Sequence, residues 1–192
     1  MVRNRSHALA GSLVLAVGVL LALAFTTAEA FYPGYSTSSL TISALGSDTG
    51  TPESRLVFNG AMVVSGGLMA AAAYFLRDVY DSMVVPALAG VTGVVGFAGV
   101  GLFPSQTGAP HALAAMVSFG GSGLVALAVA RAESAAFKYA SAVLGVAILV
   151  TLAGFVGLRD GTALGIGGLE RWVAYLGILW AASYGGFLLA RE

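Results

Sequence analysis

The sequence predicts an all-α integral membrane protein, a bundle of six transmembrane helices with a long outer loop between the first two. Composition is the first observation behind this prediction. Only 9 % of the 192 residues are charged, 58 % are hydrophobic, and the mean hydropathy is +0.90. A water-soluble domain carries about 25 % charged residues. Water is therefore not the solvent around most of this chain, which indicates a membrane protein.

The spacing of the charged residues is the second observation. They cluster, and the uncharged stretches between clusters are each long enough to cross about 30 Å of hydrocarbon as a helix. Helices satisfy their own backbone hydrogen bonds in lipid, and these stretches lack the two-residue alternation of membrane-barrel strands. The predicted single transmembrane domain, 1–192, has helices over about 8–28, 56–76, 83–103, 111–130, 139–158 and 171–190.

The first predicted helix shares features with a secretion signal. Arg3 and Arg5 precede an apolar run, and Ala28-Glu29-Ala30 has the small-x-small pattern of a cleavage site. The apolar run is longer than a typical signal core, so we interpret it as a retained helix. The sequence alone does not decide whether this helix is cleaved.

The outer loop, 29–55, is rich in Pro, Gly, Ser and Thr, which predicts irregular structure. A loop of this length is usually functional or packs as a cap. Basic residues favour the cytoplasmic side of membrane proteins. With both termini in the cytoplasm, the inner segments hold six basic residues and the outer segments three, which are Arg55, Arg159 and Arg171. This distribution predicts a multi-pass cell-membrane protein with cytoplasmic termini.

Charge and residue types exclude several classes of function. The formal net charge is zero, so no basic surface is available for nucleic acid. The chain has no Cys and two His, and the two His, His7 and His111, are predicted on opposite sides of the membrane. We therefore expect no metal and no cofactor. The excess of Arg over Lys, with abundant Ala, Gly and Val, indicates a prokaryotic genome rich in G and C.

Polar residues are predicted to meet at the outer ends of three helices. Asn59, His111 and Glu170 each stand at or near a predicted helix start, above a stripe of small residues that favours close helix packing. We therefore predict a polar, outward-facing pocket that binds a lipid headgroup or a small polar ligand, with Arg171 or Arg55 available for an anion. Membrane lipids are the expected partners.

Three other interpretations remain open at this stage. Polar residues near helix ends also serve as caps or anchors, and Trp172 and Trp180 are typical of interfacial aromatic residues. Ser43, His111 and Glu170 have the residue types of a hydrolytic relay, which would make the protein a lipid-modifying hydrolase. The chain could also be an accessory subunit bound to another membrane protein or to a second copy. The absence of a GxSxG motif favours binding over catalysis.

A short set of motifs resembles a known family. The residues are TISALG at 41–46, Pro52-Glu53, Phe58-Asn59, Phe103-Pro104 and Glu170-Arg171 before Trp180. They resemble the domain-of-unknown-function 998 membrane proteins, six-helix prokaryotic proteins without an established activity. The IS-x-LG and PE residues are also similar to the damage-regulated autophagy modulator group. The resemblance implies the six-helix fold, no particular reaction, and an interest in Ser43, Gly46, Glu53, Asn59, His111, Glu170 and Arg171.

Overall fold

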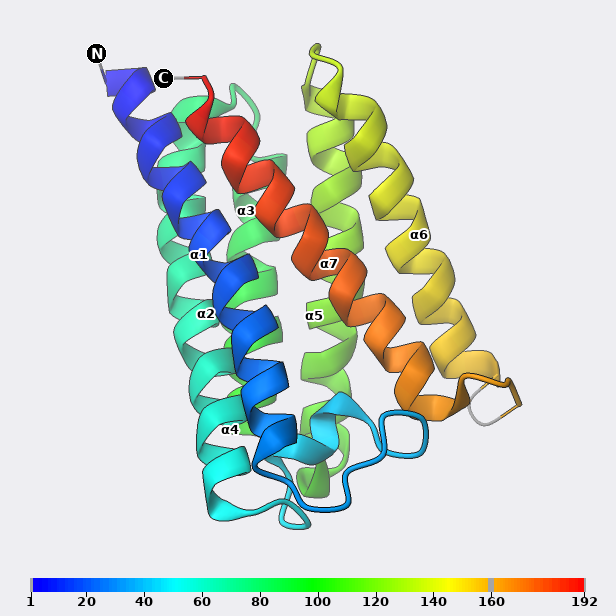
Figure 1. Ribbon diagram of the computed structural model, residues 1–192. Coiled ribbons are helices and arrows are strands. Elements are labelled where there is room, and N and C mark those ends of the chain that lie inside the picture. The colour runs from blue at the N-terminus through cyan, green and yellow to red at the C-terminus, as the bar shows by residue number, and fades with distance from the viewer. Residues whose placement is uncertain (1, 159–160, 192) are drawn as a thin grey trace.

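The computed structural model describes residues 2–158 and 161–191 and contains six helical segments long and apolar enough to cross a membrane (Figure 1). Arg159 of the predicted outer group lies outside the described residues. Five segments are single helices: α1 (Val2–Ala30), α2 (Pro52–Val79), α5 (Ala109–Ala132), α6 (Phe137–Leu158) and α7 (Gly165–Leu189). The remaining segment joins α3 (Val84–Val91), the π-helical η2 (Thr92–Phe97) and α4 (Ala98–Leu102). The predicted all-α class with six membrane-crossing helices is confirmed.

The bundle has two ends that differ in construction. The start of α1 and the end of α7 lie together at one end, which we call the terminal end (Figure 1). Residues 31–51 cross the other end, which we call the loop end, and they contain the 3-10 helix η1 (Ile42–Gly46). Ile42 and Leu45 of η1 are almost fully buried against the helices. The predicted outer loop therefore packs as a cap on the bundle.

α1 ends later and α2 begins earlier than predicted, which shortens the loop from 29–55 to 31–51. The Thr51 hydroxyl accepts a hydrogen bond from the Ser54 amide, and Pro52 occupies the first turn, so α2 begins at Pro52 rather than 56. α7 begins at Gly165 rather than 171. The prediction took only uncharged stretches as helices, but capped helix ends extend past the hydrocarbon and carry charges there.

The π-helical segment lies between α2 and α5, where glycines allow close contact. A Cβ atom on Gly96 would lie 2.7 Å from the Cα of Ser118, and one on Gly93 would lie 2.9 Å from the carbonyl oxygen of Gly66. Both distances are too short for a side chain. This segment therefore packs backbone to backbone against its neighbours, as small residues permit in lipid.

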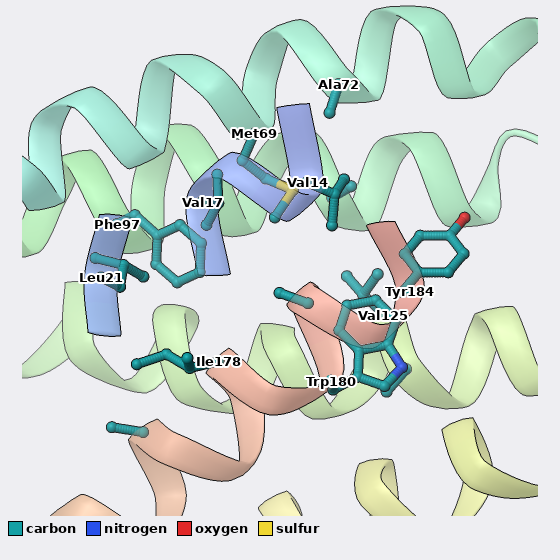
Figure 2. Packing of buried hydrophobic residues seen from close by; sticks show 14 of the residues in the cluster. Val14, Val17, Leu21, Met69, Ala72, Phe97, Val125, Ile178, Trp180 and Tyr184 are labelled. Carbon is teal, nitrogen blue, oxygen red and sulfur yellow. The ribbon is translucent and has the colours of Figure 1, made fainter. Parts of the chain in front are cut away.

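The core runs through the middle of the bundle, where α1 packs against both α2 and α7 (Figure 2). Trp180 is only 2 % exposed, whereas Trp172 is 54 % exposed. The Trp180 indole donates to the Ser141 hydroxyl at 2.8 Å, and that hydroxyl donates to the Ala126 carbonyl at 2.8 Å. The interpretation of Trp180 as an interfacial residue is therefore wrong, because its ring joins α7 to α6 and α5 inside the bundle.

Candidate functional site

Glu170 attaches the loop to α7. Its side chain is 2 % exposed, and its carboxyl group accepts hydrogen bonds from the Ile42 amide and from the Ser43 hydroxyl, the latter at 2.8 Å. The first amides of a helix have no partner within the helix, and the Glu170 carboxyl group accepts from the first amide of η1, that of Ile42. Glu170 itself lies in the second turn of α7, not at its start. It therefore joins α7 to the N-terminal end of η1.

Arg171 binds the preceding part of the same loop. Its guanidinium donates to the Glu29 carboxylate at 2.6 Å and to the Tyr35 hydroxyl at 2.7 Å. It also donates to three backbone carbonyls, those of Thr37, Leu40 and Gly167. A guanidinium has five N–H donors. Arg171 thus directs its donors to the protein itself, which leaves little capacity for the anion that the sequence analysis assigned to it.

Tyr35 extends the Arg171 contacts into the loop. Its hydroxyl donates to the Thr41 carbonyl at 2.7 Å while it accepts from Arg171. Burial raises the pKa of Tyr35 to about 12, although the neighbouring Arg171 acts in the opposite direction. The hydroxyl is therefore protonated at neutral pH and is a reliable donor to the loop.

α2 holds the opposite end of η1. The Asn59 amide donates to the Gly46 carbonyl at 2.9 Å, and the Ser54 hydroxyl donates to the Leu45 carbonyl at 2.9 Å. A Cβ atom on Gly46 would lie 2.2 Å from the Asn59 side-chain oxygen, so any larger residue would displace the Asn59 side chain. Side chains from α2 and α7 therefore bind the two ends of one 3-10 turn.

His111 stands apart from these loop contacts. Its Nδ1 donates to the Phe103 carbonyl at 2.7 Å, and the residue is 8 % exposed. This bond joins the start of α5 to the residue that follows α4. With Nδ1 protonated in the neutral ring, Nε2 is left as an acceptor.

Three of the predicted residues line one cavity between α5, α6 and α7. Ser43, His111 and Glu170 surround a space of about 340 Å³, and its other walls are mainly apolar, with Met116, Phe119, Phe155 and Val156. A narrower space of about 50 Å³ continues from Ser43 and Glu170 toward the bundle centre. We call the two together the loop-end cavity. Ser43, His111 and Glu170 lie at its loop side, and its deeper walls are mainly apolar apart from Ser118 and Ser122.

The other predicted residues lie outside the loop-end cavity. Asn59 and Arg55 border a separate shallow space on the α2 side of the loop, and Glu53 is exposed in the first turn of α2. The sequence analysis missed Glu29 and Tyr35 as partners of Arg171. Glu29 carried a usable signal, because it is an acidic residue directly after an apolar helix.

The geometry differs from a hydrolytic triad. In such a triad a histidine accepts the serine proton and an acid orients the histidine. Here the Ser43 hydroxyl donates directly to Glu170, and His111 Nδ1 donates to Phe103. Across residues 2–158 and 161–191, no three His, Cys, Asp or Glu side chains gather in a way that could hold a metal ion.

Comparison with known proteins gives a family. Residues 15–186 match the family described as "Protein of unknown function (DUF998)". The chain belongs to the DUF998 family. No curated protein and no solved structure matches it. The similarity to the damage-regulated autophagy modulator group therefore stays a prediction, whereas the DUF998 resemblance is confirmed.

Proposed function

We propose that this DUF998 protein binds an amphiphilic lipid in the loop-end cavity, with the headgroup beside Ser43, His111 and Glu170 and the hydrocarbon chain among the apolar walls. The observation that carries the proposal is the gradient along the cavity. Polar side chains cluster under the loop, and apolar side chains such as Val17 and Ile178 from the middle of α1 and α7 line the deeper part. A lipid in a bilayer has the same gradient, with its polar group at the interface and its chain toward the midplane.

The cavity chemistry favours a headgroup that donates hydrogen bonds. Glu170 accepts through both oxygens, Ser43 retains acceptor lone pairs, and neutral His111 offers Nε2. Arg171 binds the loop rather than the cavity. Hydroxyl and amine headgroups match this set of acceptors, and a headgroup whose main feature is a negative charge does not.

The proposal places the loop end outside a cell membrane and both termini in the cytoplasm, as the basic residues favour. Single cysteines can test this, because the chain contains no Cys. Ser38→Cys and Thr107→Cys should react with an impermeant maleimide in intact cells, and Ser134→Cys should react only after permeabilisation. The reverse pattern would place the loop-end cavity on the cytoplasmic side.

Lipid binding is tested with a monoacylglycerol that carries a photoreactive diazirine in its acyl chain. Its glycerol headgroup offers two hydroxyl donors without charge. Cross-linking of the purified protein, followed by peptide mass spectrometry, should mark the α5 and α6 walls of the cavity. Ala115 borders both parts of the cavity, so Ala115→Trp should abolish this labelling.

Leu113→Trp is the matched control, because Leu113 lies on the same helix and is 66 % exposed on its outer face. Equal labelling of both variants would contradict the binding proposal. Release of free fatty acid from the probe would indicate the hydrolase alternative instead. Recovery of a stoichiometric membrane-protein partner with no labelled cavity would favour the accessory-subunit alternative.

A further inference from the structure

A second cavity lies at the terminal end, far from the site described above. It encloses about 580 Å³ among the start of α1, the turn after α2 and the end of α5. We call it the terminal-end cavity. Its polar lining residues are His7, Tyr80, Asp81, Ser82, Arg131, Glu133, Ser134 and Arg191.

Glu133 and Arg191 form an ion pair in the lining of this cavity. Glu133 has a side chain only 4 % exposed, and it accepts from Arg191 at 2.7 Å and from the Tyr80 hydroxyl at 2.9 Å. The Tyr80 hydroxyl in turn lies 2.8 Å from that of Tyr184. Burial raises the pKa of Tyr80 above its usual range, so Tyr80 remains a donor to Glu133. Both carboxylate oxygens of Glu133 are therefore occupied by protein groups.

Arg131 differs from Arg77 and Lys138, two other basic residues at this end. Arg77 lies over the Tyr74 ring and donates to the Tyr74 carbonyl, and Lys138 lies over the Tyr139 ring. Arg131 borders the cavity and makes no ion pair or hydrogen bond with any residue in the described part of the chain. The cavity thus contains, beside Asp81 and Glu133, a guanidinium whose N–H groups are not used by the described residues.

We propose that the terminal-end cavity binds a phosphate group, with Arg131 as its principal contact. A guanidinium matches phosphate oxygens with two parallel donors. The exposed Ser134 lines the same cavity, where its hydroxyl can donate to the same anion. The apolar part of the lining, Val84, Val85, Ala128 and Ala132, continues toward the hydrocarbon, so a glycerophospholipid headgroup and a soluble phosphate are the two sources of this chemistry.

Native mass spectrometry of the full chain in dodecyl maltoside tests the proposal. The probes are dioleoyl-phosphatidylglycerol, dioleoylglycerol without phosphate, and inorganic phosphate. The phosphatidylglycerol adduct should weaken about tenfold in Arg131→Gln, since charge-assisted bonds to phosphate are among the stronger hydrogen bonds. Arg77→Gln, which removes the same charge at the same end, should bind like the parent protein.

The other probes separate the two sources of phosphate. Binding of phosphatidylglycerol that inorganic phosphate does not displace identifies the lipid, and displacement at millimolar phosphate identifies a soluble anion. Equal affinity of the parent protein for dioleoylglycerol and phosphatidylglycerol would overturn the proposal, as would equal phosphatidylglycerol binding by Arg131→Gln and Arg77→Gln.

A second pair of variants keeps the test valid if Arg131→Gln fails to fold. Ser134 and Ala136 are both exposed in the turn after α5, but only Ser134 borders the cavity. Ser134→Asp should weaken the adduct by repelling the phosphate, and Ala136→Asp should not. Equal effects of these two variants would also overturn the proposal.

Discussion

The two ends of the bundle are held by different kinds of contact. At the loop end, side chains of α2 and α7 bind backbone groups of residues 31–51, as Glu170 does with Ile42 and Arg171 with Thr37, in addition to side chains such as Ser43 and Glu29. At the terminal end, side chains bind one another. Tyr80 and Arg191 meet at Glu133, and Ser6 donates to Asp78 at 2.8 Å.

The different lengths of the connecting segments at the two ends explain this difference. A long segment without regular structure presents many backbone amides and carbonyls that need partners when they are buried. Residues 31–51 meet this need with polar side chains from the helices, whereas the turns at the terminal end contain few backbone groups to satisfy. The polar residues of α7 near the loop are therefore committed first to holding the loop, and a ligand uses the acceptor capacity that remains.

The largest expected effect is that of removing the Glu170 carboxyl group. In Glu170→Gln one of the two acceptor oxygens becomes an NH₂ donor, which would face the donors of Ile42 or Ser43. We expect a loss of about 3 kcal/mol of unfolding free energy, because a buried donor is left without a partner. Thermal or denaturant unfolding in detergent measures this loss.

Glu53→Gln serves as the control for Glu170→Gln. Glu53 is exposed, so the same chemical change should alter stability by less than about 0.5 kcal/mol. Hydrogen exchange should show faster exchange in residues 31–51 for Glu170→Gln and unchanged exchange at the terminal end. Uniformly faster exchange at both ends would show that the two ends are not independent.

Removing the Arg171 guanidinium should have the next largest effect. Its side chain is 14 % exposed, and that of its partner Glu29 is 23 % exposed. We expect Arg171→Gln to lose about 2 kcal/mol, since several hydrogen bonds to carbonyls disappear together with a partly buried ion pair. Arg171→Lys should not restore stability, because one ammonium cannot reach the same set of acceptors.

A double-mutant cycle with Glu29→Gln isolates the ion pair. The combined loss should be smaller than the sum of the two single losses, because either single change already breaks the pair. Additive losses would instead indicate that the loop carbonyls, rather than Glu29, account for the stabilisation by Arg171.

The sequence was sufficient for the fold because lipid solubility leaves a strong pattern in the chain. Uncharged stretches of about 20 residues correspond to the membrane-crossing helices. Their boundaries were less predictable, since the cap at Thr51 and the left-handed backbone of Gly165 at the start of α7 depend on local geometry rather than on hydropathy. The burial of Trp180 was also not predictable from hydropathy, because it depends on which face of α7 packs against Ser141 of α6.

The candidate site could be predicted only in part. The stripes of small residues pointed to His111 and Glu170 on inward faces, where the structure places them. The path of residues 31–51 could not be inferred from periodicity, because the segment has none. The direct bond from Ser43 to Glu170 and the commitment of Arg171 to the loop therefore required coordinates.

A smaller effect is expected from the terminal-end network. Tyr80→Phe removes the donor to Glu133 but leaves Arg191 in place, so we expect a loss of about 1 kcal/mol. Glu133→Gln should lose somewhat more, since it also breaks the pair with Arg191. Neither variant should change exchange in residues 31–51. Protection lost at the loop end in Tyr80→Phe would show coupling through Tyr184.

The last expected effect is a pH dependence confined to the loop end. The pKa of Tyr35 is raised to about 12 from an ordinary value of 10.0, mainly by burial. A folded-state pKa above the unfolded value means that Tyr35 stabilises the fold fully below pH 10, and that this contribution disappears as the pH rises to about 12. Deprotonation removes the hydrogen that Tyr35 donates to Thr41. Stability measured from pH 9 to 12 should therefore fall more in the parent protein than in Tyr35→Phe, which has no hydroxyl to titrate. Identical slopes for the two proteins would assign the alkaline loss to other groups and remove Tyr35 from the set of contacts that hold the loop.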